Sequence, residues 1–265
     1  MAYRAPFFLA HHALRLAGDS AVTITGAAAA GFAKTRLLDS RHDAVFRWSA
    51  AQANHAITLD RGAGFAALPA LDHFIIPSGH NFAGASAEVQ SDDNSGFTSP
   101  TTRWTGTLPA GLVSDAFATS SSERYLRLIV STSGQWELAE FMPTVLRTPS
   151  TVTGPDPEYD DDLVPNYFET TLRSGNVYRL ELGDDVREFA PRFRALTTAD
   201  RATLDTLWTD TARGLYPLWY GPPDDAEPVL PCHLVGEYRR KQDSPNPIGT
   251  GLTFDVALRL REVLS

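Results

Sequence analysis

The chain has 265 residues, of which 43% are hydrophobic and 21% are charged, and this is the composition of a globular protein. At about 150 residues per domain, the length predicts one large or two ordinary domains, with enough core to need neither disulfides nor metal. Cys232 is the single cysteine, which excludes an internal disulfide and a cysteine-built zinc site. No apolar run has the length of a membrane span, and the first residues lack the pattern of a signal peptide. We therefore expect neither membrane association nor export.

The net charge of −9 is concentrated in the second half of the chain. Residues 1–150 carry 11 basic and 12 acidic side chains, whereas residues 151–265 carry 12 and 20. Proteins that coat DNA or RNA show the opposite sign or a basic stripe. The sequence therefore predicts no direct, sequence-specific nucleic-acid partner.

The first half alternates short apolar runs with clusters of Gly, Ser, Asn, Asp and Pro. Strand-like runs lie at 21–25, 55–60, 71–77, 86–91 and 124–130. In the second of them Ile57 and Leu59 share one face, while Thr58 and Asp60 take the other. Several short strands separated by turn signals predict an antiparallel β-sandwich, to which we assign residues 1–148.

Residues 149–166 are rich in proline and acid. Pro149, Pro155, Pro157 and Pro165 disfavour helix, and Asp160, Asp161 and Asp162 leave little to bury. This segment is predicted to be a linker or an exposed strap. An acidic triplet also suggests calcium, but the residues lack the spacing of a calcium loop.

The third segment, residues 167–265, combines strands with one helix. Thr198 is a candidate N-cap, Asp200 lies in the first turn, and Gly214 supplies the stop. Strands are expected at 177–182, 215–220, 231–241 and 251–263, with Cys232 as a small core residue. A strand, a helix and then three strands predict an α+β domain, a β-sandwich with one helix.

Catalytic patterns are missing from the sequence. It contains no phosphate-binding loop, no nucleophile elbow and no HExxH, and no two histidines stand four apart on a helix around a carboxylate. We therefore expect no catalysis, no catalytic residue, no metal site and no cofactor. The alternative is a glycosidase that uses carboxylates such as Asp92 and Glu123.

Sugar-binding surfaces pair flat aromatic rings with polar groups that contact hydroxyls. This pattern predicts five candidate glycan-binding residues, namely Asp92, Asn94, Arg103, Trp104 and Trp136. In the alternative interpretation, both tryptophans belong to the sandwich core.

The order of motifs over residues 20–145 resembles the discoidin, or galactose-binding-like, family. The matching positions are Trp48; Ile57, Asp60 and Gly62; Gly79, His80 and Asn81; Val89, Ser91 and Asp93; and Arg124, Tyr125, Arg127 and Leu128. The His-Asn form of the turn is similar to that in galactose-binding-like domains of bacteriophage minor tail proteins. Some members of the family carry a structural calcium ion, and the sequence does not identify ligands for one.

The second half is similar to tail-tube-like or distal-tail domains of phages. The resemblance lies in the segments Phe189 to Phe193, the helix that begins near Thr198, the run 214–219 and the last strand. It implies a structural protein of the phage tail, in a ring, the distal tail or the tail tip, that is assembled in the host cytoplasm. Its expected partners are further copies in a ring and neighbouring tail proteins.

Two sets of residues are the candidate assembly surface, namely Asp160, Asp161 and Asp162 in the strap, and Arg259 and Arg261 on the last strand. An ordinary solvated face is the alternative for the arginines. The alternative function for the whole chain is a carbohydrate-binding module that recognises host or cell-wall glycan.

Overall fold

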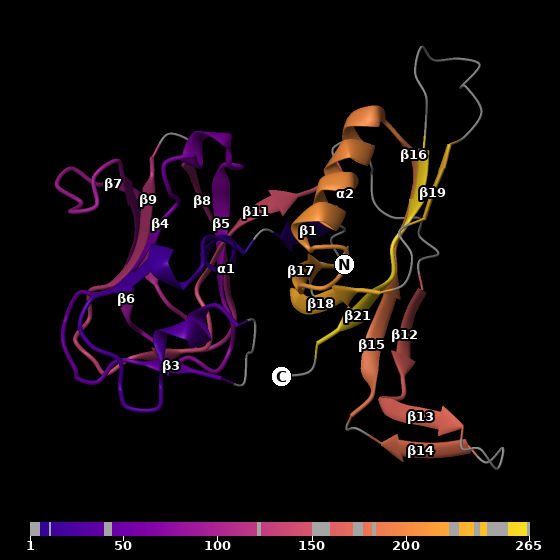
Figure 1. Cartoon of the computed structure of the whole chain (residues 1–265), viewed down its shortest axis with the longest axis horizontal. Helices are drawn as coiled ribbons and strands as arrows, with labels where there is room; N and C mark the ends of the chain where they lie inside the picture. The colour runs from indigo at the N-terminus through magenta and orange to yellow at the C-terminus, as the bar shows by residue number, and fades with distance from the viewer. Residues whose placement is uncertain are drawn as a thin grey trace. The chain divides into compact units, whose positions relative to one another are not determined.

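A computed structural model describes residues 6–10, 12–39, 44–120, 123–149, 160–171, 177–181, 184–222, 228–235, 239–242 and 254–263. The chain forms two compact units (Figure 1). The sandwich unit contains His11–Leu146, and the terminal unit combines Met1–Ala10 with Arg147–Leu264. The terminal unit is thus built from both ends of the chain, whereas the sequence predicts residues 1–148 as one domain.

The sandwich unit is antiparallel, as predicted. One sheet has the order β2-β4-β9-β6-β7, and in the other β5 lies between β11 and β8. The strands are β2 (Val22–Ile24), β3 (Phe46–Arg47), β4 (His55–Asp60), β5 (Leu71–Ile76), β6 (Ser86–Asp92), β7 (Thr101–Thr107), β8 (Val113–Ser120), β9 (Tyr125–Val130), β10 (Glu137–Leu138) and β11 (Met142–Arg147). Short helical segments are α1 (Ala13–Ala17), η1 (Asp19–Ala21), η2 (Lys34–Leu37) and η3 (Phe65–Ala67).

The core of the sandwich unit lies between its two sheets. Ile57 and Leu59 of β4 are buried, as the alternation predicts, and they belong to the same cluster as Phe74 of β5. Trp48 is buried, and its Nε1 donates to the Thr25 carbonyl at 2.8 Å. Because buried Trp N–H groups need a partner, this bond accounts for the position of the indole.

The terminal unit is a twisted antiparallel sheet with one helix. Its pairing order is β12-β15-β21-β18-β17-β1, and β16, β20 and β19 pair in a second set. The strands are β1 (Phe7–Ala10), β12 (Asp160–Val164), β13 (Tyr167–Thr171), β14 (Val177–Glu181), β15 (Val186–Ala190), β16 (Arg192–Leu196), β17 (Leu218–Gly221), β18 (Leu230–Leu234), β19 (Arg239–Gln242), β20 (Phe254–Ala257) and β21 (Leu260–Glu262). β13 and β14 pair as a hairpin.

The helix α2 spans Thr198–Asp210. Its N-cap is Thr197, one residue before the predicted cap at Thr198. The Thr197 hydroxyl accepts the Asp200 N–H at 3.2 Å, and Asp200 Oδ2 accepts the Thr197 N–H at 3.3 Å. This reciprocal capping box satisfies two amides that the helix leaves unpaired. The helix ends before Gly214, whose φ of +85° and close approach to the Leu234 carbonyl exclude a side chain.

Two sequence expectations about the terminal unit are corrected. Residues 160–164, predicted as part of a linker, form β12, because their backbone pairs with β15 from Asp160↔Ala190 to Val164↔Val186. The predicted last strand is split into β20 and β21 by Leu258 and Arg259, and residues 251–253 lie outside the described part. Residues 150–159 of the predicted linker are likewise outside it.

The inward face of the last segment is confirmed. Phe254, Val256, Leu258 and Leu260 are all buried, and Cys232 lies in the same core cluster. Burial raises the pKa of the Cys232 thiol, so this side chain behaves as a small apolar group. Among the described residues, neither helix has the length and apolar character needed to cross a bilayer.

Candidate functional site

Asp92 and Asn94 hold a turn at the end of β6. The Asp92 carboxylate accepts the N–H groups of Asn94 at 2.9 Å and Ser99 at 3.1 Å, and its side chain is buried. Asn94 Oδ1 accepts the Gly96 N–H at 2.7 Å. The backbone hydrogen bond from Asn94 keeps the pKa of Asp92 below its usual value. These two predicted site residues therefore organise the loop that follows them.

Arg103 lies beside this turn on β7. Its Nε donates to Ser91 Oγ at 2.7 Å, and its guanidinium forms an ion pair with Glu123. Asp92 and Glu123, the carboxylates of the glycosidase alternative, thus both have partners within the fold.

The two tryptophans of the predicted site lie half-buried against the core. Trp104 packs edge-on against Phe74, with ring centroids 5.0 Å apart, and its Nε1 donates to Asp115 Oδ2 at 2.7 Å. Trp136 packs edge-on against Phe82 at 5.7 Å, and its Nε1 donates to the Thr132 carbonyl at 3.0 Å. Both indoles also pack on the sandwich core cluster, so the core interpretation accounts for their packing.

A different group of side chains gathers at one end of the sandwich unit. This loop cluster consists of Phe32, Arg36, Arg47, Asn81 and Glu137. The Arg47 guanidinium carbon lies 4.3 Å from the centroid of the Phe32 ring, and that of Arg36 lies 5.5 Å from it. Arg47 Nε donates to Glu137 Oε2 at 2.6 Å, and the two side chains are 37% and 23% exposed. The cluster therefore joins an aromatic ring, guanidinium groups and a carboxylate at the surface.

Backbone pairing fixes the positions of this cluster. Arg47 and Glu137 are directly opposite in the β3–β10 ladder. Asn81 Oδ1 accepts the Glu137 N–H at 2.8 Å, and its Nδ2 donates to the Gln135 carbonyl at 3.1 Å. Because an Arg–carboxylate pair has a planar, directional geometry, its anchoring to two strands fixes the orientation of its donors and acceptors.

His80 holds the turn that places Asn81. Its Nδ1 accepts the Phe82 N–H at 3.1 Å, so Nε2 carries the proton and donates to the Gly111 carbonyl at 2.8 Å. Burial lowers the pKa of His80. The neutral ring is thus the form that fits the turn.

The sequence analysis identifies none of Phe32, Arg36, Arg47 and Glu137 as a site residue, and it singles out Asn81 only within the family turn. Arg47 precedes the buried Trp48, and alternation across a strand places adjacent residues on opposite faces. This alternation could have identified Arg47 as a residue on the face opposite the buried Trp48. Its pairing with Glu137, 90 residues away, has no sequence signature.

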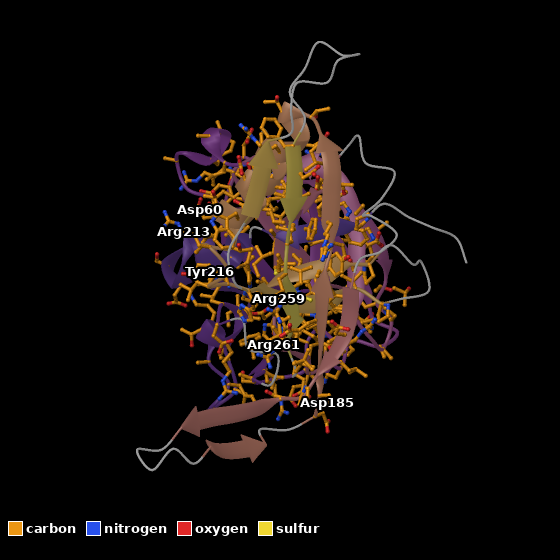
Figure 2. All side chains as sticks on the ribbon, turned by 90° about the vertical axis from the view of Figure 1, so that its right-hand side faces the viewer. Asp60, Asp185, Arg213, Tyr216, Arg259 and Arg261 are labelled. Atoms are coloured by element: carbon orange, nitrogen blue, oxygen red, sulfur yellow. The ribbon has the colours of Figure 1, made fainter. Side chains whose placement is uncertain are left out.

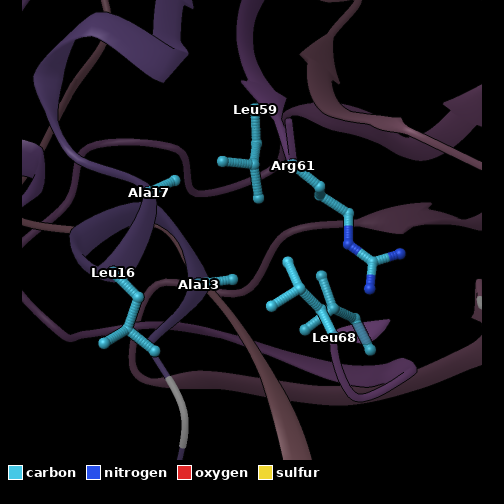
Figure 3. Close-up of a pocket in the computed structure, with 7 residues that line it drawn as sticks. Ala13, Leu16, Ala17, Leu59, Arg61 and Leu68 are labelled. Atoms are coloured by element: carbon cyan, nitrogen blue, oxygen red, sulfur yellow. The ribbon is translucent and has the colours of Figure 1, made fainter. Parts of the chain in front are cut away.

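The sandwich unit also has a cavity of about 390 Å³ beside α1. Figure 3 shows Arg61 and Leu68 across from Ala13, Leu16 and Ala17. Its lining is apolar apart from Arg61, which donates to the carbonyls of Glu123 at 3.3 Å and Pro69 at 3.0 Å. Specific small-molecule sites carry several convergent polar groups, and the lining of this cavity contributes a single one.

The candidate assembly residues of the terminal unit lie on β12, on β21 and, for Arg259, in the step between β20 and β21. Figure 2 labels Arg259 and Arg261. Both contact Glu188, with Arg259 Nε 2.9 Å from Glu188 Oε2 and Arg261 Nε 3.8 Å from Oε1. Asp160, Asp161 and Asp162 are the first three residues of β12. Within the described residues, no group of three or more His, Cys, Asp or Glu side chains is arranged to hold a metal ion.

Comparison with known proteins finds similarity in solved structures. No protein-family model matches the chain, and no curated protein matches it. Chitosan-binding module 1 of a chitosanase/glucanase from Paenibacillus sp. IK-5 is 24% identical, covers 49% of this chain and 97% of its own, and gives a TM-score of 0.38. A structure of the CBM32-1 and CBM32-2 domains of Clostridium perfringens ZmpB is 17% identical, with coverages of 47% and 33% and a TM-score of 0.40. CBM32-6 of CpGH89 from C. perfringens is 12% identical, with coverages of 50% and 98% and a TM-score of 0.37. About half of this chain is therefore similar to carbohydrate-binding modules of the CBM32 type and to a chitosan-binding module.

Proposed function

We propose that the sandwich unit is a galactose-binding-like domain of the discoidin type that binds carbohydrate through the loop cluster. The observation that carries this proposal is the Arg47–Glu137 ion pair, which lies over Phe32, is partly exposed and is fixed by the β3–β10 ladder. This end of the unit presents an aromatic ring together with hydrogen-bond donors and acceptors.

Each group has a distinct part in the proposed binding. The Phe32 ring contacts the C–H face of a pyranose, since sugar rings have an apolar face that packs on aromatic rings. Arg47 and Asn81 donate to ring hydroxyls, and Glu137 accepts from them. No bond is made or broken, so the proposed protein is not an enzyme.

Binding can be tested by titration calorimetry with the full chain. The first probes are chitotriose, GalNAc and an unsaturated mannuronic acid, which are the ligands named in structures similar to this chain. Arg47→Gln removes a charged donor, and we expect affinity to fall at least about tenfold, since a hydrogen bond to a charged group contributes about 1.5–3 kcal/mol. Phe32→Ala should weaken binding through the loss of ring contact.

Arg124→Gln is the matched control. Arg124 forms an ion pair with Asp60 in which the side chains are 36% and 32% exposed, close to the values for Arg47 and Glu137. Both substitutions should cost at most about 1 kcal/mol of folding stability. Two outcomes would place the site outside the loop cluster. In the first, Arg47→Gln and Arg124→Gln bind with equal affinity. In the second, Trp104→Ala or Arg103→Ala abolishes binding in a folded protein while Arg47→Gln binds normally.

The second candidate function is a structural component of a phage tail. Its support is the resemblance of the second half of the sequence to tail-tube-like or distal-tail domains, together with the architecture of the terminal unit, an antiparallel sheet with one helix. In this proposal the protein resides in the virion tail after assembly in the host cytoplasm, and it contacts copies of itself and neighbouring tail proteins. Light scattering tests it, because assembly predicts a discrete multiple of the chain mass.

A further inference from the structure

The loop cluster carries more positive than negative charge. Arg36 and Arg47 both place a guanidinium group over the Phe32 ring, with their central carbons 5.5 and 4.3 Å from its centroid. The carboxylate of the cluster belongs to Glu137, so two positive groups and one negative group leave a formal charge of +1. An anion that reaches this ring therefore meets a net positive charge.

Arg47 already has a counter-ion within the fold. Its guanidinium forms an ion pair with Glu137, and the two residues lie directly opposite each other in the β3–β10 ladder. Lys34, another cation of η2, is likewise paired, because its Nζ lies 3.1 Å from Asp19 Oδ1. The fold therefore supplies a carboxylate to each of these two cations.

Arg36 differs from both of them. Its Nη1 donates to the Val45 carbonyl at 3.2 Å, and among the described residues no carboxylate lies within ion-pair distance of its guanidinium. A guanidinium group has five N–H donors, and a backbone carbonyl supplies an acceptor but no negative charge. The side chain is partly exposed, so a ligand can reach it.

From this charge balance we propose that the loop cluster prefers carbohydrates that carry a carboxylate, the hexuronic acids, and that Arg36 binds this group. The inference rests on the proposed carbohydrate binding and names the substrate class of the same site. A planar guanidinium matches the two oxygens of a carboxylate, to which it can donate two parallel hydrogen bonds. Arg36 is therefore a specificity-determining residue, whereas the other polar members of the cluster contact hydroxyls that neutral and acidic sugars share.

The position of Arg36 favours a carboxylate that is attached directly to the sugar ring. Its guanidinium lies over the same aromatic ring that the proposed binding assigns to the pyranose. In a hexuronic acid the carboxylate carbon is bonded to C5, so a pyranose in contact with Phe32 holds its charge close to that ring. A sulfate or phosphate ester holds its charge further out, because a bridging oxygen separates the charged group from the sugar carbon.

Titration calorimetry on the full chain, near pH 7 where carboxylates are ionised, tests the preference. The probes are galacturonic, glucuronic and mannuronic acid, each compared with its own methyl ester, which has the same ring without the charge. We expect the best-bound acid to bind at least about fivefold more tightly than its ester, which is the upper range for partly exposed ion pairs. Raising the salt from 0.1 M to 1 M shortens the Debye length from ~10 Å to ~3 Å and should reduce this ratio.

Arg36→Gln identifies the residue responsible. Loss of its charge should bring the ratio of acid to ester affinity to about one, whereas damage to the fold would weaken both probes equally and leave the ratio unchanged. Arg36→Lys keeps the charge without the planar fork and should retain part of the preference. The matched control is Arg213→Gln, an exposed arginine of the terminal unit, which removes the same charge and should bind both probes as the wild type does.

The possible failures are distinguishable. Equal binding of acid and ester by the wild type overturns the preference and leaves the carbohydrate proposal standing. A preference that persists unchanged in Arg36→Gln contradicts the role of Arg36, and tighter binding of galactose 6-sulfate than of galacturonic acid contradicts the choice of a carboxylate. If no acid, no ester and none of the sugars named for the carbohydrate proposal binds, that proposal fails and this inference fails with it.

Discussion

At the scale of single residues, burial favours the neutral form of two histidine rings in the sandwich unit. Burial lowers the pKa of both His55 and His80 from the ordinary value of 6.5. In His80 one ring nitrogen accepts a backbone N–H and the other donates to a carbonyl. Protonation would place a proton where the Phe82 amide already donates, so the folded state resists it.

This arrangement predicts that the free energy of unfolding falls as the pH drops. The unfolded chain takes up protons near pH 6.5, whereas the folded chain takes them up only at lower pH. The contribution of His80 is therefore complete above pH 6.5 and is lost as the pH falls below it. Urea unfolding from pH 8 to pH 5 measures this slope.

His80→Asn is the informative variant, because an Asn oxygen can still accept the Phe82 N–H but cannot be protonated in this range. Its stability should depend less on pH than that of the wild type. Identical slopes in the two proteins would mean that His80 does not titrate between the folded and unfolded states.

At the scale of elements, α2 shows how a local signal fixes a boundary. Thr197 and Asp200 form a capping box, and Asp200 is 1% exposed. Leu204 and Leu207 then follow on the buried face and pack into the core of the terminal unit. The cap thus sets where the helix begins, and its apolar stripe fixes it against the sheet.

Thr197→Ala should lower the free energy of unfolding of the terminal unit by about 0.5–2 kcal/mol, because the first turn loses its side-chain acceptor. Thr209→Ala, at an exposed position of the same helix, is the control and should change stability by less than about 0.5 kcal/mol. Chemical denaturation followed by circular dichroism measures both. An equal loss in the two variants would show that helix propensity, and not the cap, is responsible.

Strands with strong alternation were predictable from sequence, and polar or isolated ones were not. β4 and β9 alternate cleanly and were predicted, but β7 reads TTRWTGT and is held by its ladder with β6. β12 was predicted as linker because its first three residues are acids and prolines lie close to it in the sequence, yet pairing with β15 overrides that preference.

The loop cluster was beyond sequence reasoning for a related reason. Its members come from segments around residues 32, 47, 81 and 137, which only the finished sandwich brings together. Trp104 and Trp136, the aromatic residues that the sequence analysis singles out, pack against the core cluster and are partly exposed. A large side chain in a sequence is compatible both with ligand binding and with a place in the core, so its size alone does not distinguish the two roles.

At the scale of the whole molecule, the two units have separate hydrophobic cores. Phe8 of β1 belongs to the terminal core, where it stacks on Tyr220 at 5.5 Å and packs edge-on against Phe193 at 6.2 Å. Each unit therefore has its own set of stabilising contacts, although the chain passes from one to the other twice.

Phe8→Ala should destabilise the terminal unit by about 3–5 kcal/mol, the usual cost of truncating a fully buried phenylalanine. Differential scanning calorimetry should show one transition moved to lower temperature and another unchanged. Ile57→Val, in the core of the sandwich, should shift the other transition by a smaller amount. If Phe8→Ala lowered both transitions equally, the units would unfold as one.

The pairing of β1 with β17 has a consequence for the order of synthesis. Phe8 lies opposite Tyr220, so the first strand of the terminal unit leaves the ribosome more than two hundred residues before its neighbour. All of the sandwich residues, 11–146, are made in that interval. At about 5–20 residues per second, the apolar segment Phe7–Ala10 stays without β17, the strand that lies opposite Phe7 to Leu9, for at least about ten seconds. The sandwich can fold during that delay. Once folded, it would reduce the distance that residues 11–146 span between Phe7–Ala10 and the later strands of the terminal unit.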